Sequence, residues 1–371
     1  MVETSTMNGS VLLINWRDTR NPEAGGAETY YHEIFSRLAS RGLSVTVLAH
    51  RFRGAAREEV VDGVRVVRTG SRWLFNVAAV PWVLRHARRF DLIIEDLNKI
   101  PFFTPLFVRQ RRLHLVMHFF GTAIFREVFF LPALYVFCAE RVVRLVYRNE
   151  RFVAISRSTC DEISSFCRKP AAVVEPGIDT RFYHPCSPKS RYPTILCVTR
   201  LKRYKNVQFL IRSLSRIRER IPQARLIIAG SGEYRRVLER IAREQGLEEA
   251  VEFTGFVSRE RKRELLSQAW VFVNPSVKEG WGISTIEAAL CGTVTVASDV
   301  AGLRDSVRDG ETGWLFRYGD SAHFCERTLL VLCDNALRDR MQERAREFAL
   351  GFDWELIARS MEAQVRRALD E

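Results

Sequence analysis

Short apolar runs alternate with segments of helical periodicity along the whole chain of 371 residues. In the first half, the runs that predict buried strands cover residues 11–15, 45–49, 92–96, 113–118, 152–156 and 172–175. A hairpin is expected at residues 60–66, because the Asp62-Gly63 pair suits a tight primed turn. Strands that alternate with helices are typical of α/β proteins with a parallel sheet.

The alternation is interrupted at residues 180–193, where Pro185, Pro188 and Pro193 disfavour both a helix and a central strand. It then restarts, with strands expected at residues 194–199, 226–229, 251–253, 271–274 and 293–297. The closing segment predicts a helix. We therefore expect two Rossmann-like domains, over residues 1–180 and 181–350, followed by a C-terminal helix over residues 351–371.

The chain is basic, with 57 Lys and Arg residues against 44 Asp and Glu residues and a formal net charge of +13. Such a charge can hold nucleotide diphosphates, acidic lipid headgroups or nucleic acid, or it can form a solvated surface. No nucleic-acid-binding motif accompanies the arginines, so we expect no nucleic-acid partner. The hydrophobic content of 47% is that of a globular protein.

The eight cysteines are scattered and show no C-x-x-C spacing. This pattern argues against a zinc site or a disulfide framework and suits reduced thiols in a cytosol. Residues 1–10 lack the regions of a signal peptide, and no apolar run is long enough to span a bilayer. A cytoplasmic location is expected.

The segment with the most chemical content is residues 278–292, which lies between two predicted strands. Glu279 falls in the loop at the carboxyl end of the first strand, where parallel sheets open their ligand crevice, and Glu287 falls in the following helix. Residues 282–285 would present free backbone N–H groups at the start of that helix, which is a natural seat for phosphate. The segment predicts a nucleotide-sugar pocket.

This spacing of two glutamates with seven residues between them resembles the signature of retaining glycosyltransferases of family 4. The resemblance covers nearly the whole chain. It implies a GT-B fold, in which two Rossmann-like domains face a cleft and the last helix crosses back to the N-terminal domain. It also implies a hexosyltransferase-type enzyme that transfers a sugar from a nucleoside-diphosphate sugar to a hydroxyl acceptor. Glu279 would hold hydroxyls of the donor sugar, and Glu287 would hold the ribose.

Two cations, Arg200 and Lys205, follow the first strand of the second predicted domain. At the carboxyl end of that strand they could neutralise the diphosphate leaving group. Their spacing is similar to the family's Arg-and-Lys phosphate pair. The alternative is a basic surface loop, since Lys202 and Arg203 lie in the same stretch.

In the first predicted domain, the Gly25-Gly26 loop follows the first strand and matches a Gly-Gly-Ala-Glu loop of the family. The resemblance implies contact with the donor phosphates or the acceptor, although a double glycine is also an ordinary turn. His118 closes another predicted strand. Relatives carry a histidine there that bonds the transferred sugar; the alternative is a core histidine, and His114, in the middle of the strand, ranks below it.

The resemblance implies two sets of site residues. The expected catalytic residues are His118, Glu279, Arg200 and Lys205. The expected donor-binding residues are Gly25, Gly26, Gly280, Trp281, Gly282, Ile283, Ser284, Glu287, Phe256 and Val257, of which Phe256 and Val257 resemble the loop that borders the base. The chain has no Asp-x-Asp, so no metal and no cofactor are expected beside the donor.

The acceptor side is less specific. Residues 73–147 are rich in aromatics that are interleaved with basic clusters at 85–89 and 109–112. These residues would suit docking on the inner face of an anionic membrane to reach a lipid-linked acceptor, a packed core with solvated arginines, or an apolar pocket for a small acceptor. Alternative functions are a nucleotide-sugar epimerase, a phosphorylase, or a non-catalytic nucleotide-sugar-binding protein that docks at membranes.

Overall fold

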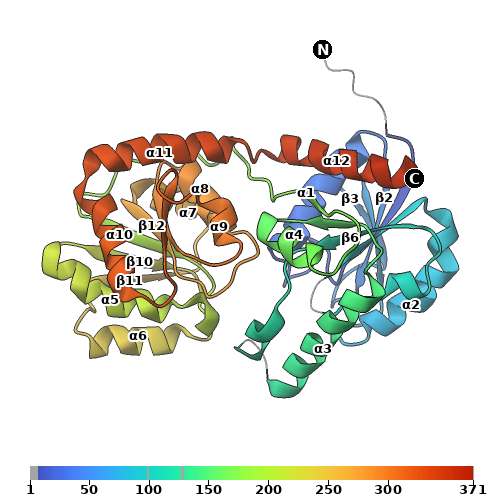
Figure 1. The fold of residues 1–371 in the computed structure, drawn as a ribbon, viewed down its shortest axis with the longest axis horizontal. Helices are drawn as coiled ribbons and strands as arrows, with labels where there is room; N and C mark the ends of the chain where they lie inside the picture. The colour runs from blue at the N-terminus through green and yellow to red at the C-terminus, as the bar shows by residue number, and fades with distance from the viewer. Residues whose placement is uncertain (1–6, 98–99, 127–128, 371) are drawn as a thin grey trace, which may run out of the picture. The chain divides into compact units, whose positions relative to one another are not determined.

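The computed structural model describes residues 7–97, 100–126 and 129–370 (Figure 1). The chain divides into two compact units. Unit 1 comprises Met1–Gly177 together with Trp354–Glu371, and unit 2 comprises Ile178–Asp353. Each unit is a sheet with helices on both faces, which is the Rossmann-like architecture predicted from the alternation of strands and helices.

The sheet of unit 1 has the strand order β3-β4-β2-β1-β5-β6-β7-β8. Its strands are β1 (Ser10–Ile14), β2 (Ser44–His50), β3 (Glu58–Val61), β4 (Val64–Thr69), β5 (Leu92–Asp96), β6 (Arg111–Val116), β7 (Phe152–Ala154) and β8 (Ala172–Val173). All neighbours are parallel except β3 and β4, which form the predicted hairpin. Asp62 and Gly63 both have positive φ, 48° and 80°, as a primed turn requires.

The helices of unit 1 cover both faces of this sheet (Figure 1). They are α1 (Gly26–Ser40), α2 (Phe75–His86), α3 (Phe130–Val146), α4 (Arg157–Ser164) and α12 (Trp354–Asp370), with 3-10 turns η1 (Ala87–Arg89), η2 (Thr104–Leu106) and η3 (Gly121–Arg126). The strand predicted at 113–118 ends at Val116, so His118 lies beyond the strand and does not close it. The segment predicted at 172–175 is shortened to β8.

The sheet of unit 2 has the order β11-β10-β9-β12-β13-β14 and is parallel throughout. Its strands are β9 (Thr194–Val198), β10 (Arg225–Ala229), β11 (Val251–Gly255), β12 (Val271–Asn274), β13 (Val294–Ser298) and β14 (Gly313–Phe316). In chain order this is 3-2-1-4-5-6, the order of dinucleotide-binding Rossmann folds. The last strand, β14, was not among the strands predicted from the sequence.

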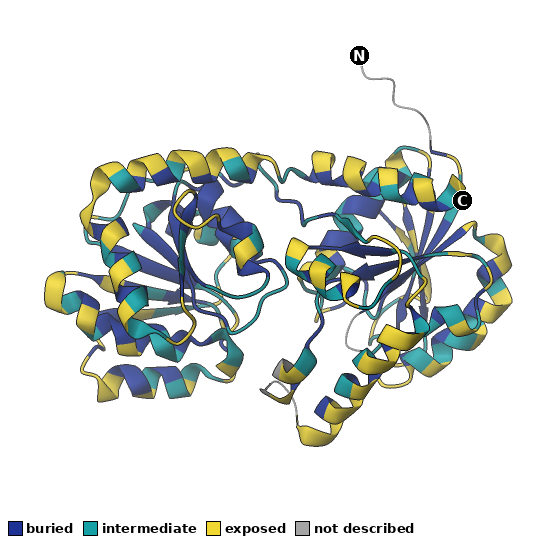
Figure 2. Ribbon diagram, in the orientation of Figure 1, coloured by how far each residue is buried: buried dark blue, intermediate teal, exposed yellow. Residues whose placement is uncertain are grey.

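The helices of unit 2 pack their apolar faces on this sheet, where both faces are buried (Figure 2). They are α5 (Val207–Arg220), α6 (Arg235–Glu244), α7 (Arg259–Gln268), α8 (Ile283–Leu290), α9 (Leu303–Ser306), α10 (Ser321–Cys333) and α11 (Asn335–Leu350). The loop after β9 also contains a 3-10 turn, η4 (Arg203–Lys205). Within the described ranges, no helix of either unit combines the length and apolar character needed to cross a membrane.

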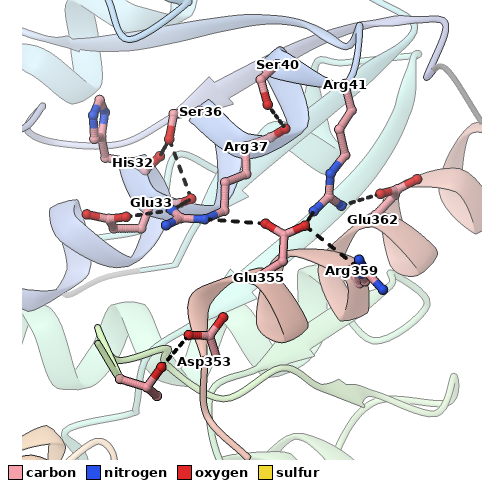
Figure 3. A network of polar contacts seen from close by, with 11 residues as sticks. His32, Glu33, Ser36, Arg37, Ser40, Arg41, Asp353, Glu355, Arg359 and Glu362 are labelled. Atoms are coloured by element: carbon pink, nitrogen blue, oxygen red, sulfur yellow. Dashed lines mark hydrogen bonds and ion pairs between the residues drawn. The ribbon is translucent and has the colours of Figure 1, made fainter. Parts of the chain in front are cut away.

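The last helix, α12, belongs to unit 1 and lies against α1, as the resemblance implied (Figure 3). Arg41, directly after α1, donates to Glu355 in the first turn of α12 and to Glu362 two turns further on, at 2.6 Å for the second contact. Ile357 and Met361 of α12 are buried, which adds apolar stabilisation to its packing on α1 and β6. The chain therefore leaves unit 1 after Gly177 and returns to it at Trp354.

Candidate functional site

The strand order of unit 2 places its topological switch point between β9 and β12, because the chain runs from β9 to β10 on one side and later to β12 on the other. In open α/β sheets, ligands bind outside the carboxyl ends of the two strands at such a point. The loop after β9 carries Lys205, and the loop after β12 carries Glu279. Their side chains meet, with Lys205 Nζ 2.5 Å from Glu279 Oε1.

Both members of this ion pair are largely withdrawn from solvent, with 13% of the Lys205 side chain and 17% of the Glu279 side chain exposed. Burial alone would raise the pKa of Glu279, but the attraction of Lys205 and hydrogen bonds from Lys205 and Ser276 lower it. Burial would likewise lower the pKa of Lys205, but Glu279 raises it. Both side chains are therefore charged at neutral pH.

The loop that carries Arg200 and Lys205 is fixed by a second loop, the glycine turn after β10. Leu201 donates its N–H to the carbonyl of Ser231 at 2.9 Å. A Cβ on Gly232 would lie 2.3 Å from the Leu201 carbonyl oxygen, so only glycine allows this approach. Arg200 is exposed. Its positive charge acts to lower the pKa of Lys205, because the two cations lie close enough to repel each other.

The N-terminus of α8 follows Glu279 directly. Gly282 precedes the helix with φ +83° and ψ +50°, a left-handed conformation that favours glycine. The first amides of a helix have no acceptor within the helix, so those of Ile283 and Ser284 can meet an anion. The side chain of Trp281 is 2% exposed and packs edge-on against Phe352, so only its backbone can reach a ligand at this surface.

The second glutamate of the motif, Glu287, is buried in α8 and is held by side chains from two other segments. Its Oε2 lies 2.5 Å from Nζ of Lys262, in the first turns of α7. It also bonds the Tyr183 hydroxyl, and burial together with the charge of Glu287 raises the pKa of that phenol. Sequence reasoning missed both partners. The signal for Lys262 was its place one helical turn after the loop that contains Phe256 and Val257.

The loop between β11 and α7 presents Phe256 to solvent, with 85% of the residue exposed, and Val257 partly buried beside it. Ser258 caps α7 by accepting the N–H of Arg261 at 3.1 Å, which fixes where the loop ends. An exposed aromatic ring at the carboxyl edge of a nucleotide-binding sheet offers a flat apolar surface.

Three predicted site residues belong to unit 1. Gly25 donates its N–H to Oε2 of Glu28 at 2.7 Å and so opens α1, and Gly26 is exposed. His118 lies on the loop after β6, half-buried, with its ring 4.5 Å from that of Phe120. Strands β1, β5 and β6 are neighbours and run parallel, so the loops that follow β1 and β6 lie at the same edge of the sheet. The double glycine is on the first of these loops and the histidine is on the second.

A buried polar network fixes the loop after β5 and connects β5 to β6. Glu95, at the end of β5, accepts the Phe102 N–H at 2.7 Å and the Tyr147 hydroxyl at 2.7 Å. On β6, His114 bonds Glu150 at 3.2 Å and lies 3.5 Å from Glu95. His114 is fully buried in this network, which gives it a structural role.

The architecture is that of the GT-B class, two Rossmann-like units in one chain, and solved structures of that class match it. Sucrose-phosphate synthase from Thermosynechococcus elongatus has a TM-score of 0.79 and 22% identity, with 97% of this chain and 99% of that chain covered. Anabaena Alr3699/HepE in complex with UDP-glucose has a TM-score of 0.76 and 19% identity, with 97% and 100% covered.

Sequence comparisons define the family. Glycosyl transferases group 1 matches residues 181–348, and Glycosyltransferase Family 4 matches residues 24–182. A GDP-mannose-dependent alpha-(1-6)-phosphatidylinositol monomannoside mannosyltransferase of Mycolicibacterium smegmatis is 33% identical over 79% of this chain and 81% of its own length. Glycogen synthase of Mycobacterium tuberculosis H37Rv is 27% identical over 94% and 92%. The chain belongs to the group 1 glycosyltransferases of family 4 and is a glycosyltransferase.

Proposed function

We propose that this glycosyltransferase moves a sugar from a nucleoside-diphosphate sugar to a hydroxyl acceptor, with retention of configuration and without a metal ion. The observation that carries the proposal is the buried Lys205–Glu279 pair at the switch point of unit 2. It places a fixed cation and a fixed carboxylate side by side, where this class of sheet binds nucleotides. The relative HepE was crystallised with UDP-glucose.

The diphosphate would be held by positive groups of unit 2. Lys205 and Arg200 supply two cations, and the first amides of α8 supply the positive end of a helix. As the bond from the sugar to the phosphate oxygen breaks, negative charge accumulates on that oxygen, and pre-oriented cations stabilise it. These groups provide the charge that a divalent ion would otherwise provide.

Glu279 would accept hydrogen bonds from the hydroxyls of the donor sugar. An ionised carboxylate only accepts hydrogen bonds, and Glu279 keeps its charge because Lys205 lowers its pKa. Glu287 would accept from the ribose hydroxyls in place of, or beside, Lys262. In unit 1, His118 and the Gly25-Gly26 loop remain the predicted contacts of the transferred sugar and of the phosphates or the acceptor.

Retention requires that the new bond form on the face of the sugar that the leaving group vacates. The bond from the anomeric carbon to the phosphate oxygen breaks, and the acceptor oxygen bonds to the same carbon. The acceptor proton passes to the departing phosphate oxygen, whose charge Arg200 and Lys205 balance. This scheme assigns no covalent nucleophile to the chain.

Peripheral contact with an anionic membrane, where a lipid-linked acceptor is reached, is the second part of the proposal. Exposed aromatic side chains of unit 1 support it, since Trp73 is 83% exposed and Phe129 is 89% exposed. Aromatic side chains beside basic residues are typical of proteins that bind at the membrane interface.

The test is product analysis with UDP-, GDP- and ADP-sugars, each offered a panel of small hydroxyl acceptors and lipid-linked acceptors, with and without EDTA. The expected result is a new glycoside with the anomeric configuration of the donor, formed equally with chelator. An epimerised donor, a sugar phosphate formed only with inorganic phosphate, or binding without conversion would identify one of the alternative functions. Inversion, or loss of activity in EDTA, would refute the retaining or metal-independent part.

A further inference from the structure

Helix α3 of unit 1 has two apolar faces, and in the part of the chain that the structure describes only one of them is buried. Ala133, Val136, Ala139 and Val143 are buried against the rest of unit 1. The opposite face is also apolar and is exposed, consisting of Leu131, Leu134, Tyr135, Cys138, Val142 and Leu145. At about 100° per residue these six positions fall within an arc of roughly 100°. Figure 2 shows α3 as largely exposed on its outer side.

The exposure of this outer face is large. Leu131 is 76% exposed and Leu145 is 71% exposed, and Phe129, directly before the helix, is 89% exposed. An ordinary surface helix of a globular protein carries polar residues on the face away from the core. A continuous exposed apolar stripe over four turns marks an interaction surface instead.

Arginines lie on one side of the stripe: Arg141 borders it, and Arg144 lies further round the helix, with its guanidinium 5.9 Å from the ring centre of Phe166. Arg141 and Arg144, on adjacent turns of α3, are both exposed, and Arg148 follows in the next turn of the chain. The Arg141 guanidinium lies 4.7 Å from the ring centre of Phe137, which holds it beside the apolar face. No carboxylate is among the six residues of the stripe.

A small cavity of about 190 Å³ opens at this arginine edge, lined by Gly121, Phe137, Glu140, Arg141 and Arg144. The Glu140 carboxylate accepts the backbone N–H groups of Phe120 at 2.6 Å and Gly121 at 2.8 Å, and so fixes the inner wall of the cavity. Arg141 and Arg144 on the same wall are suited to a phosphate, because arginine pairs with phosphate oxygens through two parallel hydrogen bonds.

We infer that the outer face of α3 is the surface by which the protein docks on an anionic bilayer, with Arg141 and Arg144 bound to lipid headgroup phosphates. The apolar stripe enters the boundary between headgroups and acyl chains, and the arginines stay at headgroup level. This inference rests on the proposed function, in which a lipid-linked acceptor is reached at a membrane. It names the element that makes the contact and the lipid charge that it recognises.

Charge complementarity selects the bilayer over a second copy of the chain. Two copies that paired through this face in antiparallel fashion would bring two rows of arginines into one interface, where like charges repel. An anionic bilayer instead places negative charge along the whole length of the helix, roughly 25 Å for its 17 residues. Two arginines near such a surface contribute about 1 kcal/mol each.

The experiment is co-sedimentation of the full chain with vesicles of pure phosphatidylcholine and of phosphatidylcholine with phosphatidylglycerol, at low and high salt. The variants are Leu131→Gln with Leu145→Gln, and Arg141→Gln with Arg144→Gln. The matched control is Val60→Gln with Leu356→Gln, which removes two exposed apolar side chains elsewhere on unit 1. Melting temperature and affinity for UDP, GDP and ADP are measured on each variant in the absence of vesicles.

We expect binding to anionic vesicles only, about thirtyfold weaker for the arginine pair at low salt, lost for the leucine pair and unchanged for the control. If the wild-type protein does not bind anionic vesicles, or if the α3 variants bind them as the wild type does, the inference is overturned. So would a dimer in solution that the leucine pair dissociates, because the face would then belong to a second copy. Nucleotide affinity distinguishes failure of the proposed function from failure of the docking inference. If no protein binds a nucleotide, the proposed function is refuted, and the vesicle result is unaffected.

Discussion

The ammonium group of Lys205 lies 2.5 Å from a carboxylate oxygen of Glu279, although the residues are 74 positions apart in the chain. The contact joins the loops after β9 and β12, the two strands that flank the switch point of unit 2. Each of these buried charges is compensated only while its partner is present. Substituting one member or both members therefore has different effects on stability.

Breaking the pair should cost more than removing it. Lys205→Met leaves Glu279 as a buried uncompensated charge, and Glu279→Gln does the same to Lys205, so each should lower the free energy of unfolding by about 3 kcal/mol. The double variant should cost less than the sum of the two. Chemical denaturation of the four proteins measures the coupling, and additive effects within about 0.5 kcal/mol would show that the pair is not formed in solution.

A matched substitution in the same loop supplies the control. Lys202→Met removes a lysine that is 44% exposed and lies 3.6 Å from the exposed Glu233. Exposed pairs of this kind contribute little to stability, so its free energy of unfolding should stay within about 0.5 kcal/mol of wild type. A larger loss there would point to disruption of the loop rather than to the buried pair.

Much of the fold could be predicted from local sequence pattern. The strand predicted at 92–96 is β5 without change, because an apolar run begins directly after Asp91 and all five residues of the strand are buried. By contrast β14, with the sequence Gly-Trp-Leu-Phe, was missed. Its extended form comes from pairing with β13 and not from any alternation of its own, and such pairing depends on tertiary structure.

The buried network around His114 predicts a pH dependence of stability. Burial opposes the charged imidazole, but hydrogen bonds to Glu150 and Glu95 raise the pKa of His114 above its ordinary value. Burial would raise the pKa of Glu150, but His114 and Arg112 lower it to about 2. Glu95 is likewise lowered, and Tyr147 stays neutral because burial raises its pKa.

These pKa shifts make the stability of the folded chain depend on pH. The contribution of His114 is complete below its unfolded pKa of about 6.5 and is lost as the pH rises through the raised folded value. The contribution of Glu150 is complete above about 4.5 and is lost as the pH falls towards 2. The difference in unfolding free energy between wild type and His114→Gln should therefore be largest between about pH 4.5 and 6.5 and smaller at pH 9. A difference that stays constant over this range would contradict the charged network.

The return of α12 to unit 1 should depend on Arg41. This one guanidinium bonds both Glu355 and Glu362 (Figure 3). Burial would raise the pKa of Glu362, but hydrogen bonds from Arg366 and Arg41 lower it. Arg41→Met should destabilise the protein by about 1 kcal/mol, since the groups are partly exposed, and should speed amide exchange in α12. Arg359→Met, whose contact with Glu355 is 3.8 Å and more exposed, is the matched control. Equal exchange in both variants would show that apolar packing alone holds the helix.

Only part of the candidate site could be predicted from the sequence. The spacing of the motif located Glu279 and Glu287, because both lie on one segment between two strands. The partners of Glu287 could not be found in the same way. Lys262 and Tyr183 reach it from α7 and from the first residues of unit 2, and only the packing of these segments beside α8 brings the three together.

The division of labour between the two glutamates and the cations gives the last prediction. If Arg200 and Lys205 hold the diphosphate and Glu287 holds the ribose, the affinity for inorganic pyrophosphate should depend on the two cations and not on Glu287. Lys205→Met should then weaken both pyrophosphate and the preferred nucleoside diphosphate. Glu287→Gln should weaken the nucleoside diphosphate by about tenfold or more, the loss of one charged hydrogen bond, and leave pyrophosphate unchanged.

Isothermal titration calorimetry with pyrophosphate, UDP, GDP and ADP measures both affinities for each protein. Glu233→Gln is the matched control, since its carboxylate is 74% exposed near the same end of the sheet and should change neither affinity. A loss of pyrophosphate binding in Glu287→Gln would mean that the freed Lys262 or a shift of α8 alters the phosphate seat, because Glu287 otherwise contacts no group of that seat in the described structure. Full nucleoside-diphosphate affinity in the same variant would instead remove Glu287 from the ribose site and leave it a structural partner of Lys262 and Tyr183.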